Sequence, residues 1–208
     1  MRTVAALLLL AAFASAGPET ADRTPERRAK LLGSRGGSRA TEEAVSKGLA
    51  WLARHQSEEG YWDTDDFGTA ADHGVTDGKG GGWHGEPVAC PFDREVTALA
   101  TLAFLGAGHH PGTEPHGQRV RAALDWLAGQ VASGTLFAIA YSTQALVEAW
   151  EMCGEEEYRR AAERGVATMI GSRHPGAGWR YSPGVRMASG VPTTTAVVVA
   201  LRAAEDAG

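Results

Sequence analysis

Two kinds of predicted helix alternate along this chain, and this alternation limits the fold more than any other feature of the sequence. The segments at about 41–54, 117–133 and 155–170 each carry one apolar stripe, which is typical of a helix with one face in water. The segments at about 93–106, 138–153 and 192–204 are apolar nearly all round, which predicts helices buried on all sides. Two layers, with apolar helices inside and amphipathic helices outside, satisfy both requirements.

The alternation amounts to an internal repeat of helical hairpins. Trp51-Leu52 in the first segment matches Trp126-Leu127 in the third. Thr97, Thr143 and Thr195 occupy similar places in the three apolar segments. The many Thr and Val residues of the last segment also suit a strand, but the repeat favours a sixth helix. We therefore predict an all-α fold whose first helix is capped by Thr41.

The first 16 residues have the pattern of a secretory signal peptide. Arg2 gives a positive start, residues 4–13 are apolar, and Ala14-Ser15-Ala16 is a cleavage site. An uncleaved anchor is the alternative, although the apolar run is shorter than the roughly 20 residues that span a bilayer. We expect an exported protein with no transmembrane segment, a flexible linker at 17–40 and a helical domain at 41–208. Oxidising conditions allow Cys90 and Cys153 to pair, but the sequence leaves their redox state open.

The negative charge of the chain is concentrated in one inserted loop. The formal net charge of −5 argues against a general nucleic-acid binder, which needs a basic face. Residues 57–91 hold eight acidic side chains against one lysine and are rich in Gly. A loop of this length is either functional or disordered. We therefore look for chemistry there first.

Residues 47–62 closely resemble the QW repeat of squalene and terpene cyclases and related prenyltransferase-like proteins. The shared pattern is a basic residue, a Gly, an aromatic-Leu pair, and then Gln56, Gly60 and Trp62 at set spacing. Residues 164–179 resemble a degenerate second copy that ends in Gly178-Trp179, with Arg173 in place of the Gln. Residues 97–108 and 176–183 are similar to exported bacterial proteins with prenyltransferase and squalene-oxidase repeats.

This resemblance implies an α/α toroid with inner and outer rings of helices over residues 41–208. The family's toroid has about twice the six helices predicted here, so a homodimer, a missing second half or another partner would cover the apolar edges. The QW residues themselves have a structural interpretation. The Gln56 amide can bond unpaired backbone groups at a helix end, and the Trp62 ring can seal the hairpin.

Asp63, Asp65 and Asp66 are the candidate catalytic residues. Asp63-Thr64-Asp65-Asp66 spells the DxDD pattern that supplies the initiating proton in squalene–hopene-type cyclases, to which this loop is similar. A proton donor needs a carboxylic acid kept neutral in a buried site. Here the motif runs into Gly-rich sequence, which favours a solvated acidic turn. Calcium binding is a further alternative, although Phe67 and Gly74 stand where an EF-hand loop has ligands.

Zinc is the second candidate ion. Protein prenyltransferases of this fold hold zinc with Asp, Cys and His, and four residues of this chain supply those types without a recognised spacing: His73, His84, Cys90 and Asp93. Three other histidines, His109, His110 and His116, are interpreted as turn residues. No other cofactor is predicted.

Taken together, the residues favour an exported, partial α/α-toroid domain that binds or scaffolds and does not catalyse. The alternative is a terpenoid cyclase or prenyltransferase-like enzyme that uses the acidic loop around Asp63 to Asp66, or a metal-binding toroid enzyme. A carbohydrate-active enzyme is the third hypothesis, because that fold class also hosts polysaccharide lyases. No paired carboxylates on helices support it.

Overall fold

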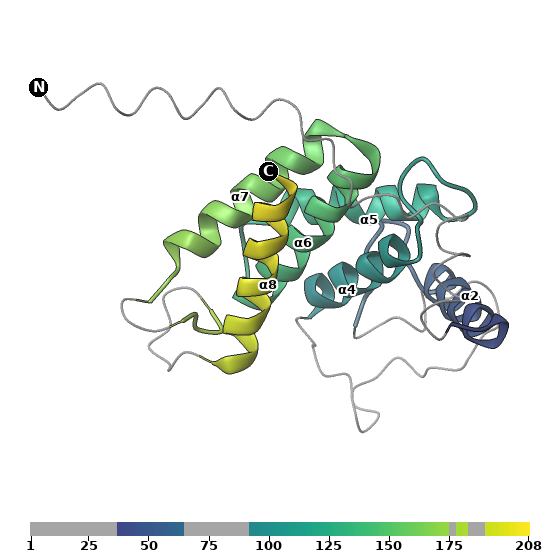
Figure 1. Ribbon diagram of the computed structural model, residues 1–208, viewed down its shortest axis with the longest axis horizontal. Helices are drawn as coiled ribbons and strands as arrows, with labels where there is room; N and C mark the ends of the chain where they lie inside the picture. The colour runs from purple at the N-terminus through teal and green to yellow at the C-terminus, as the bar shows by residue number, and fades with distance from the viewer. Residues whose placement is uncertain (1–36, 65–91, 175–177, 183–189) are drawn as a thin grey trace, which may run out of the picture.

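The computed structural model describes residues 37–64, 92–174, 178–182 and 190–208, which form six α-helices and no strand (Figure 1). In chain order these are α2 (Arg39–Arg54), α4 (Asp93–Gly106), α5 (Gly117–Gln130), α6 (Leu136–Cys153), α7 (Glu156–Gly171) and α8 (Val191–Ala207). The predicted all-α fold is therefore confirmed. The expected signal peptide and nearly all of the expected linker lie outside the described residues, as does Cys90.

The helices form two layers around α6. Helix α6 packs against α4 and α8, which are its neighbours in the inner layer, and against α7 and α5 of the outer layer. Helix α2 lies at the end of this arrangement opposite α8 (Figure 1). Helix α6 is buried around most of its circumference, because the fully buried Ile139, Ala140 and Ala145 point in different directions from its axis. The two predicted layers thus correspond to the packing of the described helices.

Burial on all sides was the wrong expectation for two of the three apolar helices. Leu99 on α4 is 48% exposed, and Val198 and Val199 on α8 are 51% and 47% exposed. Helices α4 and α8 stand at the two ends of the inner layer, so among the described helices each has an inner neighbour on one side only. The uncovered side of α4 is apolar, and that of α8 is apolar at the two valines and charged farther along at Arg202 and Asp206.

Helix α2 begins two residues before the predicted cap. Ser38 is the N-cap, and its hydroxyl accepts a hydrogen bond of 3.2 Å from the backbone N–H of Thr41. The Thr41 hydroxyl in turn accepts from the backbone N–H of Ser38 at 2.9 Å. This reciprocal capping box satisfies two N–H groups that a helix start leaves unpaired. Thr41 is therefore the third residue of the helix and forms the capping box with Ser38, which is the N-cap.

None of the helices among the described residues combines the length and the apolar character needed to cross a bilayer.

Candidate functional site

Gln56 and Gly60 attach the end of α2 to α5. The buried Gln56 amide donates hydrogen bonds to the carbonyl oxygens of Gly60 at 2.8 Å and Arg119 at 2.9 Å. Gly60 has a φ of +96°, and a Cβ at this position would lie 2.6 Å from the backbone oxygen of Ala122. Only glycine adopts such a backbone this close to another without strain. The structure places both residues where a structural role requires them.

Trp62 joins the last turn of α2 to α4. Its indole N–H donates to the carbonyl oxygen of Leu52 at 2.9 Å, which is one of the acceptors that a helix end leaves free. Its backbone N–H donates to the hydroxyl of Thr97 at 2.9 Å, and its ring is 3% exposed beside Phe104. Both polar hydrogens of Trp62 are thereby used inside the fold.

Trp179 makes the same two contacts between α7 and α8. Its indole N–H donates to the carbonyl oxygen of Met169 at 2.7 Å, and its backbone N–H donates to the hydroxyl of Thr194 at 3.0 Å. The structural counterpart of Thr97 is therefore Thr194, and the predicted Thr195 is an exposed residue of α8. Gly178 is required beside this contact, because a Cβ there would lie 2.3 Å from the Thr194 hydroxyl oxygen. The two QW-like segments thus share one geometry.

The acidic motif and the predicted metal set are only partly described. Asp63 lies in a described segment, whereas Asp65 and Asp66 lie outside the described residues, as do His73, His84 and Cys90. Asp93, the described member of the zinc set, accepts hydrogen bonds from the backbone N–H of Thr64 at 2.9 Å and from its hydroxyl at 2.6 Å. Asp93 thus holds the start of the acidic loop against α4. Among the residues with described positions, no three His, Cys, Asp or Glu side chains are grouped to hold a metal ion.

The loop between α4 and α5 also contains a turn that accounts for one of its histidines. The backbone N–H of His110 donates to the hydroxyl of Thr113 at 2.9 Å, and that hydroxyl donates back to the carbonyl oxygen of His110 at 2.8 Å. The rings of His109 and His116 meet edge to face with centroids 4.8 Å apart. Burial and the neighbouring charge of Arg119 lower the pKa of His116. These histidines therefore close and pack the turn.

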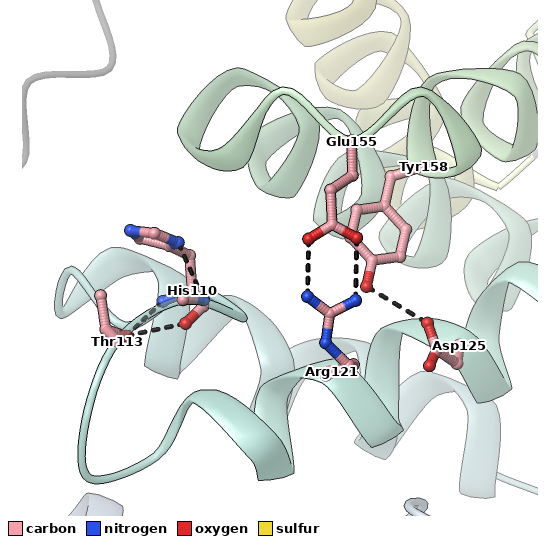
Figure 2. A network of polar contacts seen from close by, with 7 residues as sticks. His110, Thr113, Arg121, Asp125, Glu155 and Tyr158 are labelled. Carbon is pink, nitrogen blue, oxygen red and sulfur yellow. Dashed lines mark hydrogen bonds and ion pairs between the residues drawn. The ribbon is translucent and has the colours of Figure 1, made fainter.

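A polar cluster joins α5 to the start of α7 (Figure 2). Arg121 makes two parallel hydrogen bonds of 2.8 and 2.7 Å to the carboxylate of Glu155, and these lower the pKa of Glu155. Tyr158 donates to Asp125 at 3.2 Å. Burial raises the pKa of the Tyr158 hydroxyl and also that of the Asp125 carboxyl. All four side chains serve to connect two outer helices, so we assign this cluster a structural role.

Asp125→Asn is expected to make stability depend less on pH without lowering it at pH 7. The raised pKa of Asp125 means that the folded chain binds this proton more tightly than the unfolded chain. Its contribution to stability is therefore largest below the ordinary Asp pKa of about 3.9 and is lost as the pH rises through the raised value. Asn cannot ionise and still accepts from Tyr158. Urea unfolding at acid and neutral pH measures the change, and an unchanged pH dependence would contradict it.

A groove opens where the first turns of α4 and α6 meet the 178–182 segment. It has a volume of about 510 Å³ and is lined by Phe92, Arg94, Glu95, Gly134, Thr135, Ala138, Tyr181 and Ser182, which we call the Glu95 groove. Glu95 is only 8% exposed, whereas Phe92 and Tyr181 at the rim of the groove are 41% and 40% exposed. The groove thus has a buried acid and an aromatic edge.

The surroundings of Glu95 hold its carboxylate in place without a paired cation. The Thr135 hydroxyl donates to Glu95 Oε1 at 2.5 Å, and the same hydroxyl accepts from the backbone N–H of Ala138 as the N-cap of α6. Arg94 is directed elsewhere, because its guanidinium donates to the carbonyl oxygen and the hydroxyl of Ser133. Within the described ranges, no ion pair is formed by Glu95.

The negative charge of Glu95 affects the pKa of Tyr181 in this groove. Burial raises the pKa of the Tyr181 hydroxyl, the charge of Glu95 raises it further, and a hydrogen bond with Thr135 acts in the opposite direction. The carbonyl oxygen of Tyr181 accepts from the backbone N–H of Leu136 at 2.8 Å, which fixes the residue at the start of α6. The Tyr181 ring also approaches Phe137, with centroids 6.2 Å apart.

Sequence reasoning did not identify Glu95. An acid in the first turn of a helix is ordinarily explained by the helix dipole, and Glu95 follows Asp93 in the first turn of α4. Its burial depends on Thr135 and Tyr181, which are far away in sequence. The one available signal was a charged residue at the start of a helix that is otherwise apolar.

No protein-family model, curated protein or solved structure matches this chain. The described helices form a two-layered stack of helical hairpins, and two of the inner helices, α4 and α6, begin at an acidic, aromatic groove.

Proposed function

We propose that this chain is an exported helical-repeat domain of the α/α-toroid type with a binding role, and that the Glu95 groove receives a cationic group of its ligand. The observation that carries the proposal is the 8% exposed Glu95, a buried acid on the wall of an open groove. An ammonium or guanidinium group would supply the charge that this carboxylate lacks among the described residues.

The rim of the groove suits the same ligand chemistry. The rings of Phe92 and Tyr181 line the groove, and aromatic faces attract cations at close range. Thr135 already donates to Oε1 of Glu95, which orients the carboxylate toward one geometry. We therefore expect an amine attached to an apolar or aromatic body, with the body against the rings and the amine at Glu95.

The QW residues are accounted for by contacts within the fold, so the Glu95 groove carries the proposed binding role. The Gln56 amide and both polar hydrogens of Trp62 are bonded inside the fold. Among the described residues that line its groove, Glu95 is the one carboxylate, and none is a Cys or a His. Acid–base chemistry of the kind described for paired carboxylates has no second group there.

Benzylamine is expected to raise the melting temperature of the wild-type chain, and Glu95→Gln is expected to abolish the rise. At a tenfold excess over its dissociation constant, a ligand stabilises the native state by about 1.4 kcal/mol, which corresponds to roughly 3–6 °C for a chain of this size. Benzyl alcohol has the same ring without the charge and should give no rise. Glu157→Gln removes a matched, exposed carboxylate and should retain the response. A rise that survives Glu95→Gln would refute the proposal.

A cyclase-like or prenyltransferase-like enzyme is the second candidate, and one observation favours it. Thr64 is bonded to Asp93, which follows the groove residue Phe92 directly, so the acidic loop begins beside the Glu95 groove. The wild-type chain is then expected to convert squalene or a prenyl diphosphate, and replacement of Asp65 and Asp66 by Asn to stop it. Zinc or calcium should raise the melting temperature if the loop binds either ion. Absence of turnover and of any metal response excludes this candidate.

A further inference from the structure

Each of the two ends of the helix stack presents exposed apolar side chains. On α8, Val197 and Ala200 pack inward, whereas Val198 and Val199 lie on the opposite face and are about half exposed. At the other end an apolar groove of about 560 Å³ separates α2 from α4. Its lining, which defines the α2–α4 groove, is Val45, Gly48, Leu49, Trp51, Leu52, Ala103, Gly106 and Ala107.

The repeat indicates what kind of element fits this groove. Helix α7 packs against the preceding inner helix α6, and α5 likewise packs against the preceding inner helix α4. Helix α2 is the outer helix of the first hairpin. No described helix packs against α2 from the position that α6 takes before α7. Helix α2 also touches α4 only lightly. The α2–α4 groove is therefore the position of an inner helix, which is an apolar helix in the other hairpins.

We propose that α8 of a second copy of this chain lies in the α2–α4 groove, so that the copies associate head to tail. Helix α8 is an inner helix whose exposed face is apolar at Val198 and Val199 and charged farther along at Arg202 and Asp206. It would contact α2 and α4 as α6 contacts α7 and α8, with the two valines in the groove. Small residues on the groove, such as Gly48 and Gly106, leave room for its valines, because nothing lies within 4 Å of a Cβ built at either position. The contact joins two different surfaces, so each copy offers one of each.

The test uses one variant for each surface. Val199→Asp places a charge on the exposed face of α8, and Gly48→Glu places one in the groove while improving helix propensity. By light scattering, we expect the wild-type chain to have a mass of at least two copies and each variant alone to be a monomer. An equimolar mixture should form a one-to-one pair, because the first variant keeps its groove and the second keeps its α8.

Matched substitutions elsewhere should leave the association intact. Gly129→Glu makes the same change at an exposed glycine of α5 with open space around it, and Ala167→Asp adds the same charge to α7. A monomeric wild-type chain overturns the proposal. A mixture of the two variants that stays monomeric also overturns it. That result would indicate a symmetric contact between two α8 helices, which the Val199→Asp variant cannot form. Loss of association in either control variant overturns it as well.

Discussion

Trp62→Ala is expected to lower the free energy of unfolding by about 3–5 kcal/mol, the usual cost of removing a large buried aromatic side chain. The ring is 3% exposed and packs beside Phe104, so its removal leaves a cavity between α2 and α4. The carbonyl oxygen of Leu52 also loses its bond from the indole N–H. Since α2 touches α4 only lightly elsewhere, the loss should detach α2 before the rest of the fold. Urea denaturation followed by circular dichroism measures it.

A second substitution separates the hydrogen bond from the packing. Trp62→Phe keeps an aromatic ring and removes the indole N–H, so it should cost less than the alanine variant, with about 1 kcal/mol due to the lost bond. Trp179→Ala applies the same change to the second QW-like segment, where the bond goes to Met169 at the end of α7. A loss below about 1 kcal/mol for Trp62→Ala would show that the residue does not hold α2 in place.

The helices were predictable because their signal is local. The spacing of apolar residues can be seen within a short stretch of sequence. The predicted start of α4 at Asp93 and its predicted end at Gly106 agree with the structure. Burial on all sides was predictable only for α6, whose inner neighbours lie on both sides. The exposure of Leu99 and Val198 depends on which helix is last in the layer, and local spacing does not encode that.

The candidate site was harder to predict than the fold. Gln56 and Trp62 stand in one motif of consecutive residues, so a structural interpretation was available from the sequence. Glu95 becomes distinctive only when the fold places Thr135 and Tyr181 around it. Thr194 was not predictable for the same reason. The neighbouring Thr195 fits the repeat pattern equally well, and only the hydrogen bond from Trp179 distinguishes Thr194 from it. Contacts between distant segments therefore determine where the candidate site lies, and the local sequence pattern does not show them.

Gly60→Ala is expected to destabilise the chain by about 3 kcal/mol or more, from two independent causes. A left-handed backbone costs an L-residue roughly 1–2 kcal/mol, and Gly60 has a φ of +96°. The added methyl group would also lie 2.6 Å from the backbone oxygen of Ala122, and overpacking of this kind costs about 1–3 kcal/mol. The neighbouring Gln56 bond to the Gly60 carbonyl oxygen makes a shift of this loop costly in turn. Chemical denaturation measures the sum.

Other glycines of the same chain separate these two causes. Gly154 has a φ of +70° and open space around it, so Gly154→Ala should show the backbone cost alone, about 1–2 kcal/mol. Gly129 lies in α5 with nothing within 4 Å, so alanine there should stabilise the chain by about 0.5–1 kcal/mol. The difference between Gly60→Ala and Gly154→Ala then measures the contact with Ala122. A difference near zero would mean that α5 shifts to accommodate the methyl group. The end of α2 would then not be packed rigidly against α5.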